Sequence, residues 1–326
     1  MIAVLALIII IMGWITSQLL FRKGRGISIL IPFRCMRLKD LGEERLKNLK
    51  WLQRYWKAQL PGAEVIIGDD PDYSRPFSKS VAVNNAVRQA KGDIFVIVDG
   101  DGYVSAESVL HCAKEIRHAR KRGQNLWFVP YRQFYRLTKE ASDLLLASDP
   151  TDPYPFAEPV EPDFTMKDND PKIGHWYGAM IQIMPREAFE WVGGWDERFR
   201  GWGGEDHAAM RAMDTLYGLH KTLSGQVLHV WHPQIGPQGA APSIHWSERM
   251  WEKQIQIGAN DALSHRYYGA QGNPERMRKL VDEGKNAAWH EECHKHECRE
   301  RDCEHGCHEH HKHHHHRHHH HHRPSV

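Results

Sequence analysis

An acidic pair late in the chain has the surroundings expected of a reactive carboxylate. Residues 199–207, FRGWGGEDH, place Glu205 and Asp206 directly after a tryptophan and two glycines. A carboxylate within hydrogen-bond reach of a hydroxyl group can remove its proton as a general base. The helical pattern of residues 207–218 offers a second interpretation, because the dipole at a helix N-terminus favours carboxylates by itself. Helix capping accounts for neither the tryptophan nor the glycines.

A second acidic motif, Asp99-Gly-Asp101, follows the apolar run IFVIV. Two carboxylates one residue apart on a turn can face one hard cation, or one can hold the cation while the other binds a ribose hydroxyl. Mg²⁺ and Mn²⁺ prefer oxygen ligands and often share substrate phosphates with them. Asp and Gly are also ordinary turn residues, so the interpretation as a metal site depends on the place of the motif in the fold.

The elements that must position these residues begin with three apolar runs. ISILIPF (27–33), EVIIGDD (64–70) and KGDIFVIVDGD (91–101) each predict a buried strand. Apolar residues at helical spacing predict a helix over 40–60, and a second helix is expected over 78–90. Strands that alternate with helices imply a parallel sheet with helices packed on it.

Carboxylates stand at the ends of two of these strands. Asp69 and Asp70 close the second strand, and Asp99 and Asp101 close the third. In open parallel sheets, ligands gather beyond the carboxyl ends of the strands. We therefore expect all these aspartates at one rim of an α/β domain.

The chain between this sheet and the acidic pair gives weaker signals. We expect a helix over 105–122, a strand over 126–131 and a mobile loop over the Pro- and Asp-rich residues 149–171. Residues 173–199 predict a strand, a helix that starts near Pro185 and a turn at a double glycine. This path brings the chain to the acidic pair.

Composition favours one large globular domain with unlike ends. The chain has 326 residues, 41% of them hydrophobic, and 12 tryptophans, which is enough for a substantial core. Lys and Arg number 43 against 41 Asp and Glu, so no nucleic acid or other polyanion partner is expected. Cys35 and Cys112, the cysteines outside the C-terminal tail, suggest no disulfide framework.

The N-terminal run MIAVLALIIIIMGWITSQLLF contains no charge, and Arg22, Lys23 and Arg25 follow it. About 20 apolar residues suffice to cross a bilayer as a helix, so we expect a transmembrane anchor over residues 1–22. Positive charge on the C-terminal side of the span places the body of the protein in the cytoplasm. A cleavable signal peptide would want a basic stretch before the run and small residues at its end. A misassigned start codon is the third alternative.

The C-terminal tail, residues 290–326, holds most of the 25 histidines. Such a tract cannot bury a core, so we expect disorder unless it binds metal. Binding of Zn²⁺ or Ni²⁺ is one interpretation and a low-complexity tail is the other, because the spacing C-x4-C-x4-C-x3-C fits no common zinc module. The cysteines with this spacing are Cys293, Cys298, Cys303 and Cys307.

Over roughly residues 26–235 the chain resembles inverting glycosyltransferases of the GT-A fold. It is similar to family 2 enzymes in general and to β-1,4-galactosyltransferases in particular motifs. These motifs stand in the family's order: ILIPFR (29–34), FSK (77–79) with Asn84, VDGD (98–101), GGWDERFRGWGGED (193–206) and VLHVWHP (227–233). The resemblance implies a Rossmann-like nucleotide-sugar-binding sheet, a UDP-sugar or similar donor, and a divalent cation, Mn²⁺ or Mg²⁺.

The resemblance also implies roles for individual residues. Asp206 would be the catalytic base and Glu205 would hold a sugar hydroxyl. Asp101 and His229 would bind the metal with Asp99 beside them, and His232 is an alternative ligand. Nucleotide-sugar contacts would come from Pro32, Phe33, Arg34, Asp69, Asp70, Phe77, Lys79, Asn84 and Asp99. Acceptor or sugar contacts would come from Trp202, Gly203, Gly204, Glu205, Trp176 and Tyr177.

Several of these residues could instead have a purely structural role. Arg34 can pair with Glu43 or Glu44 on the following helix, and His232 before a proline can be a packed loop histidine. Trp176 and Tyr177 can line the acceptor cleft or belong to the core.

Departures from the galactosyltransferases put the donor sugar in doubt more than the reaction. Met36 stands where they carry a second arginine, and Lys79 stands where they carry another. The acidic pair is followed by His207 rather than by further aspartates. A retaining relative, the polypeptide N-acetylgalactosaminyltransferases, shares the Trp-Gly-Gly-Glu element but usually has Asn after the Glu.

Two rival functions differ from this one in what they require. A non-catalytic sugar- or metal-binding protein would lack the base or the ligands, and a nucleotidyltransferase would need a glycine-rich phosphate loop near the first strand. The expected acceptor is a glycan, a protein or a lipid-linked saccharide. Beyond the catalytic domain we expect a helical extension over 236–289 that closes over the acceptor side.

Overall fold

The computed structural model describes residues 23–34, 39–73, 75–153, 164–169, 179–201, 203–233 and 259–286. The expected anchor, the tail, Trp176, Tyr177 and Trp202 lie outside the described residues. In the part of the chain that is described, no helix is both long and apolar enough to span a bilayer.

The main sheet has six strands in the order β2-β1-β3-β8-β5-β9. β1 (Ile27–Pro32) lies between β2 (Glu64–Gly68) and β3 (Ile94–Val98) and is parallel to both. Every residue of β1 and β3 is buried, as near-continuous apolar runs in a parallel sheet require. The prediction of three parallel strands with connecting helices is confirmed.

The other half of this sheet contains one reversed strand. β8 (Ile181–Pro185) runs antiparallel to β3 and to β5 (Phe128–Val129), and β9 (Lys221–Thr222) completes the edge. Only β8 is reversed, because β5 and β9 run in the same direction as β3, so the sheet as a whole is mixed. After β3 the chain first builds a second sheet, so β8 does not follow β3 through a single helical crossover.

The second sheet has the strand order β4-β10-β6-β7. β4 (Gly102–Tyr103) pairs with β10 (Gln226–His229), which is parallel to β6 (Gln133–Leu137). β7 (Phe164–Asn169) then pairs antiparallel with β6. The expected mobile loop over 149–171 is thus wrong for residues 164–169, because their backbone hydrogen-bonding groups are used by β6.

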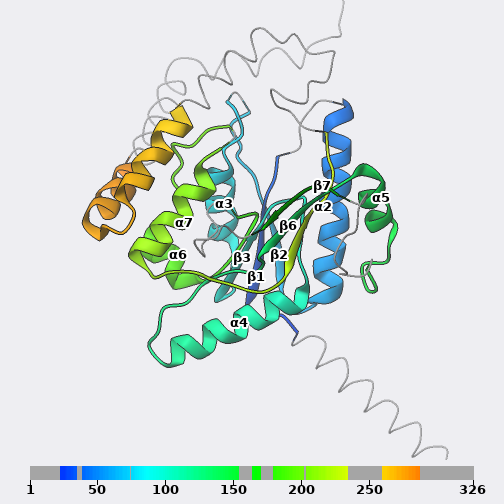
Figure 1. The fold of residues 1–326 in the computed structure, drawn as a ribbon, viewed down its shortest axis with the longest axis horizontal. Coiled ribbons are helices and arrows are strands. Elements are labelled where there is room, and N and C mark those ends of the chain that lie inside the picture. Colours follow the sequence, from blue (N-terminus) through cyan, green and yellow to red (C-terminus); the bar gives the residue numbers. More distant parts are fainter. Residues whose placement is uncertain are drawn as a thin grey trace, which may run out of the picture.

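The helices cover the main sheet and surround its rim (Figure 1). α3 packs on β1 and β2, α4 and α6 pack on β8, and α2 contacts both β2 and α5. In Figure 1, α6 and α7 lie together on the opposite side of the molecule from α2 and α5. The helices are α2 (Lys39–Gln59), α3 (Lys79–Gln89), α4 (Ala106–Lys121), α5 (Lys139–Ala147), α6 (Arg186–Val192) and α7 (Glu205–Leu216), followed by 259–270 and 274–286.

An aromatic cluster fixes α2 beneath the strand that follows the Asp-Gly-Asp turn. Trp51 stacks on Tyr55 with ring centroids 5.5 Å apart, and Tyr103 of β4 meets Tyr55 edge to face at 4.9 Å. The Tyr55 hydroxyl donates to the carbonyl of Val104 at 3.0 Å and accepts from the N–H of Ala106 at 2.9 Å. These contacts hold the end of the Asp-Gly-Asp turn against the core.

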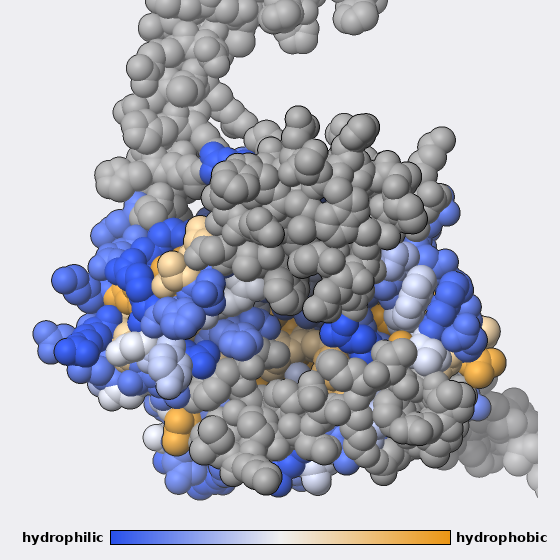
Figure 2. Space-filling model, turned by 45° about the horizontal axis from the view of Figure 1, so that its top comes forward, coloured by the Kyte–Doolittle hydropathy of each residue, from blue (hydrophilic) through white to orange (hydrophobic). Residues whose placement is uncertain are grey.

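Large apolar side chains are mostly inside. On the face shown in Figure 2, hydrophilic residues dominate the described surface and hydrophobic residues form small separate patches. Isolated exposed apolar residues are ordinary on soluble domains.

Candidate active site

The two carboxylates of the Asp-Gly-Asp turn point to different partners. The turn is closed by a hydrogen bond from the N–H of Gly102 to the carbonyl of Asp99 at 3.0 Å. Asp99 Oδ1 lies 2.5 Å from Lys79 Nζ, whereas Asp101 Oδ2 lies 3.1 Å from His232 Nε2. Asp99 was expected to share the metal with Asp101. In the structure Asp99 instead forms an ion pair with Lys79, because the side chains on either side of the central glycine point in different directions.

Asp101, His229 and His232 form a cluster that can hold a metal ion. One ligand atom from each residue lies within 4.8 Å of the other two. Strand pairing causes this proximity, because His229 is paired with Gly102 across β10 and β4. The N–H of Val230 also donates to the carbonyl of Asp101 at 2.8 Å. His232 was expected to replace His229 or to be a packed loop histidine, but the structure brings both histidines to Asp101.

The ring nitrogens of both histidines are placed to bind a metal. Nδ1 of His232 lies 3.1 Å from the carbonyl of Pro233, which can only accept a hydrogen bond, so Nδ1 carries the hydrogen and Nε2 faces Asp101. This is the tautomer-fixing contact typical of metal-binding histidines. Nδ1 of His229 is buried and has no hydrogen-bond partner among the described residues. An orphaned buried nitrogen beside a carboxylate is satisfied by a cation, so the residues fit a metal.

Burial and charge set the protonation of this cluster. Burial lowers the pKa of His229 to about 4, against the opposing pull of Asp101. Burial alone would raise the pKa of Asp101, but the two histidine rings and the Arg45 guanidinium hold it below its usual value. Near neutral pH His229 is therefore uncharged and Asp101 is ionised. A donor set of one carboxylate and two imidazoles suits Mn²⁺ better than Mg²⁺, which prefers oxygen ligands.

Lys79 connects the turn to the acidic pair. It is the first residue of α3, and its side chain is 14% exposed. Burial opposes its charge, but the carboxylates of Asp99, Asp206 and Glu205 together hold the pKa of Lys79 above its usual value. Its ammonium group also lies 5.6 Å above the ring of Trp195. One cation thus faces carboxylates from two separate loops.

Glu205 and Asp206 begin α7. Gly204 is the N-cap with a left-handed backbone, φ 88°, and gives no side-chain cap. Gly203 has φ 106°, and a Cβ there would meet no atom within 4 Å. The backbone conformation rather than crowding therefore requires glycine at position 203. The backbone N–H of Gly203 donates to Glu205 at 3.1 Å, and that of His207 donates to Asp206 at 2.8 Å.

Burial and mutual repulsion make it unfavourable for both carboxylates of the acidic pair to be charged. Burial raises the pKa of Glu205 to about 7, and the neighbouring charge of Asp206 adds to the shift while Lys79 opposes it. Two carboxylates that share a site cannot both ionise freely near neutral pH. The pair is arranged so that one member carries negative charge while the other can hold a proton.

We expect Glu205→Gln to stabilise the protein in alkali. Because the folded pKa is above the unfolded one, the stability linked to this group is present below about pH 4.5 and is lost as pH rises through about 7. At pH 8.5 the variant should be more stable than the parent by about 3 kcal/mol, and at about pH 4 the two should be similar. Urea unfolding at both pH values checks this. The exposed Glu190→Gln is the control, and a variant weaker than the parent at pH 8.5 contradicts the assignment.

Arg34 organises the loop after β2 and does not pair with Glu43 or Glu44 in the described contacts. Its guanidinium donates to the carbonyls of Asp70, Asp72 and Arg75, and its Nη2 lies 2.7 Å from Asp70 Oδ2. The side chain is only 8% exposed. The expected contact of Arg34 with a nucleotide is therefore not evident, because its donors are directed into the protein.

Asp70 shares this internal role. Its carboxylate accepts from the N–H of Ser78 at 2.9 Å and from that of Asp72 at 3.2 Å, and it is 2% exposed. Asp69 is the more accessible of the two aspartates, with a side chain that is 43% exposed. Of the two candidates for a nucleobase contact, the structure leaves Asp69.

The remaining residues expected to contact the nucleotide, Pro32, Phe33 and Phe77, also differ in their exposure to solvent. Pro32 is buried at the end of β1. Phe33 is partly exposed, and its ring lies so close to Gly100 that a Cβ atom at position 100 would be only 3.1 Å from it. Phe77 is partly exposed, and its carbonyl accepts from the N–H of Gly201 at 2.9 Å. Phe33, Phe77 and Asp69 therefore surround the rim, and Pro32 offers it only backbone.

Asn84 holds the acceptor-side motif in place. Its amide donates to the carbonyl of Trp195 at 2.9 Å and to Glu197 at 2.8 Å, and its oxygen accepts from the N–H of Trp195 at 3.0 Å. Asn84 was expected to touch the nucleotide sugar. These contacts make it a residue that positions the turn after α6.

Sequence reasoning missed three residues around the site. Arg45 of α2 lies 3.4 Å from His232 Nε2, and Trp195 lies beneath Lys79. Asn260 exchanges two hydrogen bonds with the backbone of Arg200, at 2.8 and 3.2 Å. Trp195 lies inside a recognised motif and could have been found. Arg45 and Asn260 carry no sequence signal, because their roles come from packing of distant helices.

An α/β sheet whose rim carries an Asp-x-Asp turn, a carboxylate–histidine cluster and an acidic helix start has GT-A-like architecture. The chain belongs to the family described as glycosyltransferase like family 2, whose sequence model matches residues 63–230. The protein is thus a glycosyltransferase. No curated protein is significantly similar to it in sequence.

Solved structures similar to the chain include three glycosyltransferases. The catalytic domain of Drosophila β1,4-galactosyltransferase 7 with xylobiose is 15% identical over 71% of this chain and 79% of its own, TM-score 0.36. A Pyrobaculum calidifontis mannosyltransferase with GDP-Man and Mn²⁺ is 13% identical over 82% and 76%, TM-score 0.36. GalNAc-T7 with UDP, GalNAc and Mn²⁺ is 12% identical over 79% and 55%, TM-score 0.39.

Proposed function

We propose that this glycosyltransferase transfers a sugar from a UDP-sugar to an acceptor hydroxyl with inversion and with Mn²⁺ as the cofactor. The observation that supports the proposal is Lys79, whose ammonium group lies 2.5 Å from Asp99 and whose charge is also stabilised by Glu205 and Asp206. We infer that the acidic pair and the metal cluster, which come from distant segments of the chain, serve one reaction centre.

The chain supplies the proton chemistry of the reaction. Asp206 accepts the proton of the attacking hydroxyl, and that oxygen forms the bond to the anomeric carbon as the nucleoside diphosphate leaves. Glu205 holds a sugar hydroxyl beside it. Asp101, His229 and His232 would hold the cation, which when bound stabilises negative charge on the leaving diphosphate.

The positive charge of Lys79 can also stabilise the leaving diphosphate. In the present structure it neutralises Asp99 and faces the acidic pair. A diphosphate at the rim offers the lysine a stronger anionic partner. Phe33, Phe77 and Asp69 line the side on which the nucleotide would lie. Trp202, Trp176 and Tyr177 remain proposed acceptor contacts.

A screen of nucleotide sugars tests the proposal. The full chain is incubated with UDP-, GDP-, CMP- and TDP-linked sugars, with Mn²⁺, Mg²⁺ or chelator, and release of the nucleotide is measured. We expect release from a UDP-sugar that requires Mn²⁺ and is weaker with Mg²⁺. Release from a GDP-sugar alone would overturn the donor assignment, and release that is unaffected by chelator would overturn the metal assignment.

For the N-terminal end of the chain we propose a transmembrane anchor over residues 1–22, with the catalytic domain in the cytoplasm. The proposal is supported by the uncharged N-terminal run and the basic residues that follow it. The protein should sediment with membranes and be released by detergent but not by salt, and recovery of the full-length chain in the soluble fraction contradicts it.

A further inference from the structure

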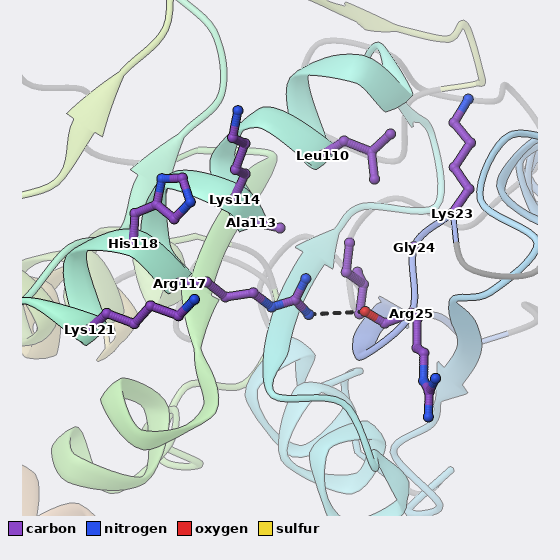
Figure 3. A pocket seen from close by; sticks show the side chains of 10 residues that line it. Lys23, Gly24, Arg25, Leu110, Ala113, Lys114, Arg117, His118 and Lys121 are labelled. Atoms are coloured by element: carbon purple, nitrogen blue, oxygen red, sulfur yellow. Dashed lines mark hydrogen bonds between the residues drawn. The ribbon is translucent and has the colours of Figure 1, made fainter. Parts of the chain in front are cut away.

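A basic pocket lies at the end of the molecule where β1 begins (Figure 3). It has a volume of about 340 Å³ and is formed by the segment Lys23–Ile27 and one face of α4. On α4, its lining residues Leu110, Lys114, Arg117, His118 and Lys121 recur at intervals of three and four, so they share one side of the helix.

The lining of this pocket is strongly basic. It includes Lys23, Arg25, Lys114, Arg117 and Lys121, and none of the described residues that line it is acidic. Figure 3 shows the Arg117 guanidinium donating to the carbonyl of Arg25, a bond of 3.0 Å that joins the two walls.

Some of this charge is already compensated. Lys23 pairs with Glu107 at 3.2 Å, and Arg117 pairs with Asp93 at 2.7 Å. Lys114 and Lys121 are exposed, and no carboxylate among the described residues forms an ion pair with either within 4 Å. The pocket therefore has a framework held by ion pairs and two lysines available to an anion.

The position of the pocket in the chain indicates what that anion is. Lys23 follows the uncharged run that ends at Phe21 by only two residues. If that run anchors the protein, as proposed above, the pocket lies at the depth of the lipid headgroups. Cytoplasmic leaflets are anionic and attract basic residues next to a span. We propose that the pocket binds the phosphate headgroup of an anionic phospholipid.

This binding would orient the catalytic domain. The pocket lies at the first residue of β1, Ile27, and the reaction rim lies beyond its last residue, Pro32. A strand of this length spans roughly 17–20 Å, so headgroup binding at one end points the rim away from the bilayer. The inference concerns a site separate from the transfer centre, and its failure leaves the transfer reaction untouched.

A lipid-retention experiment tests the inference. The full chain, purified in nonionic detergent and freed of lipid, is mixed with equal amounts of phosphatidylglycerol and phosphatidylcholine, and retained lipid is counted by native mass spectrometry. Each basic residue at an anionic surface contributes about fivefold to binding. The double variant Lys114→Gln/Lys121→Gln should therefore weaken phosphatidylglycerol retention about 25-fold.

The matched control removes two exposed lysines from α2. Lys50→Gln/Lys57→Gln has the same net charge as the pocket variant and should keep the preference for phosphatidylglycerol. Equal loss in both variants, or no loss in the pocket variant, overturns the inference. Displacement of the lipid by an equal concentration of inorganic phosphate also overturns it, because the site would then be one for free phosphate.

Discussion

Replacing Asp206 with asparagine is expected to lower kcat for sugar transfer about 1,000-fold while UDP binding stays within about twofold. A general base contributes roughly 10² to 10⁴ to the rate, and asparagine cannot take the proton. The amide keeps the shape of the side chain and can still accept the N–H of His207 that Asp206 accepts now at 2.8 Å. The donor found in the nucleotide-sugar screen supplies the assay, and calorimetry with UDP supplies the binding constant.

Asp282→Asn is the matched control for this result. It makes the same chemical change on the exposed surface of residues 274–286, and it should leave kcat unchanged. Transfer by Asp206→Asn at the parental rate would mean that another group removes the proton. Glu205→Gln would then be the next variant to assay, because it is the other carboxylate of the pair.

The second large effect is expected at the metal cluster. His229→Ala should raise the Mn²⁺ concentration for half-maximal activity at least about 100-fold, because one of three protein ligands is lost and Asp101 and His232 cannot hold the ion alone. Binding gives a readout that does not depend on activity. Mn²⁺ at 100 times its Kd should stabilise the parent by about 2.7 kcal/mol, and the same concentration should have little effect on the variant.

Thermal unfolding with and without Mn²⁺ measures this difference. His265→Ala is the control, because His265 is an exposed histidine on 259–270, far in sequence from the cluster. It should keep the full shift in Tm on addition of Mn²⁺. If His229→Ala keeps that shift as well, the ion binds elsewhere and the cluster is only a set of packed polar residues.

Much of the fold could be predicted from the sequence because its signals are local. The buried runs of β1, β2 and β3 are continuous and end at polar residues, so their type and their common rim follow from hydrophobic pattern alone. Helix starts were equally readable: Ser78 and Ser105 cap α3 and α4 with side-chain hydrogen bonds. The place of the acidic pair at the start of α7 was predicted from the helical pattern of residues 207–218.

The pairing of distant segments could not be predicted in this way. Nothing near residue 102 indicates that β4 will pair with β10, and a two-residue strand has no periodicity to detect. A strand was predicted where β8 lies, but its antiparallel direction was not, because a buried apolar run does not show in which direction a strand runs. Arg34 and Asp70 were assigned to the nucleotide through the family resemblance, yet their side chains turn inward to each other. Motif position identifies the neighbourhood of a residue but not the direction of its side chain.

The pairing of β4 with β10 has a consequence for how such a chain can diversify. The proposed metal ligands Asp101 and His229 are brought together by two paired positions, Gly102 with His229 and Tyr103 with Leu228. The whole chain between Tyr103 and Gln226 lies between these two paired strands in sequence. Insertions or deletions in the loops between β4 and β10 can change the surface on the proposed acceptor side while the register of the β4–β10 pair stays the same. A single-residue insertion inside β10, by contrast, would turn the histidine to the opposite face of the sheet.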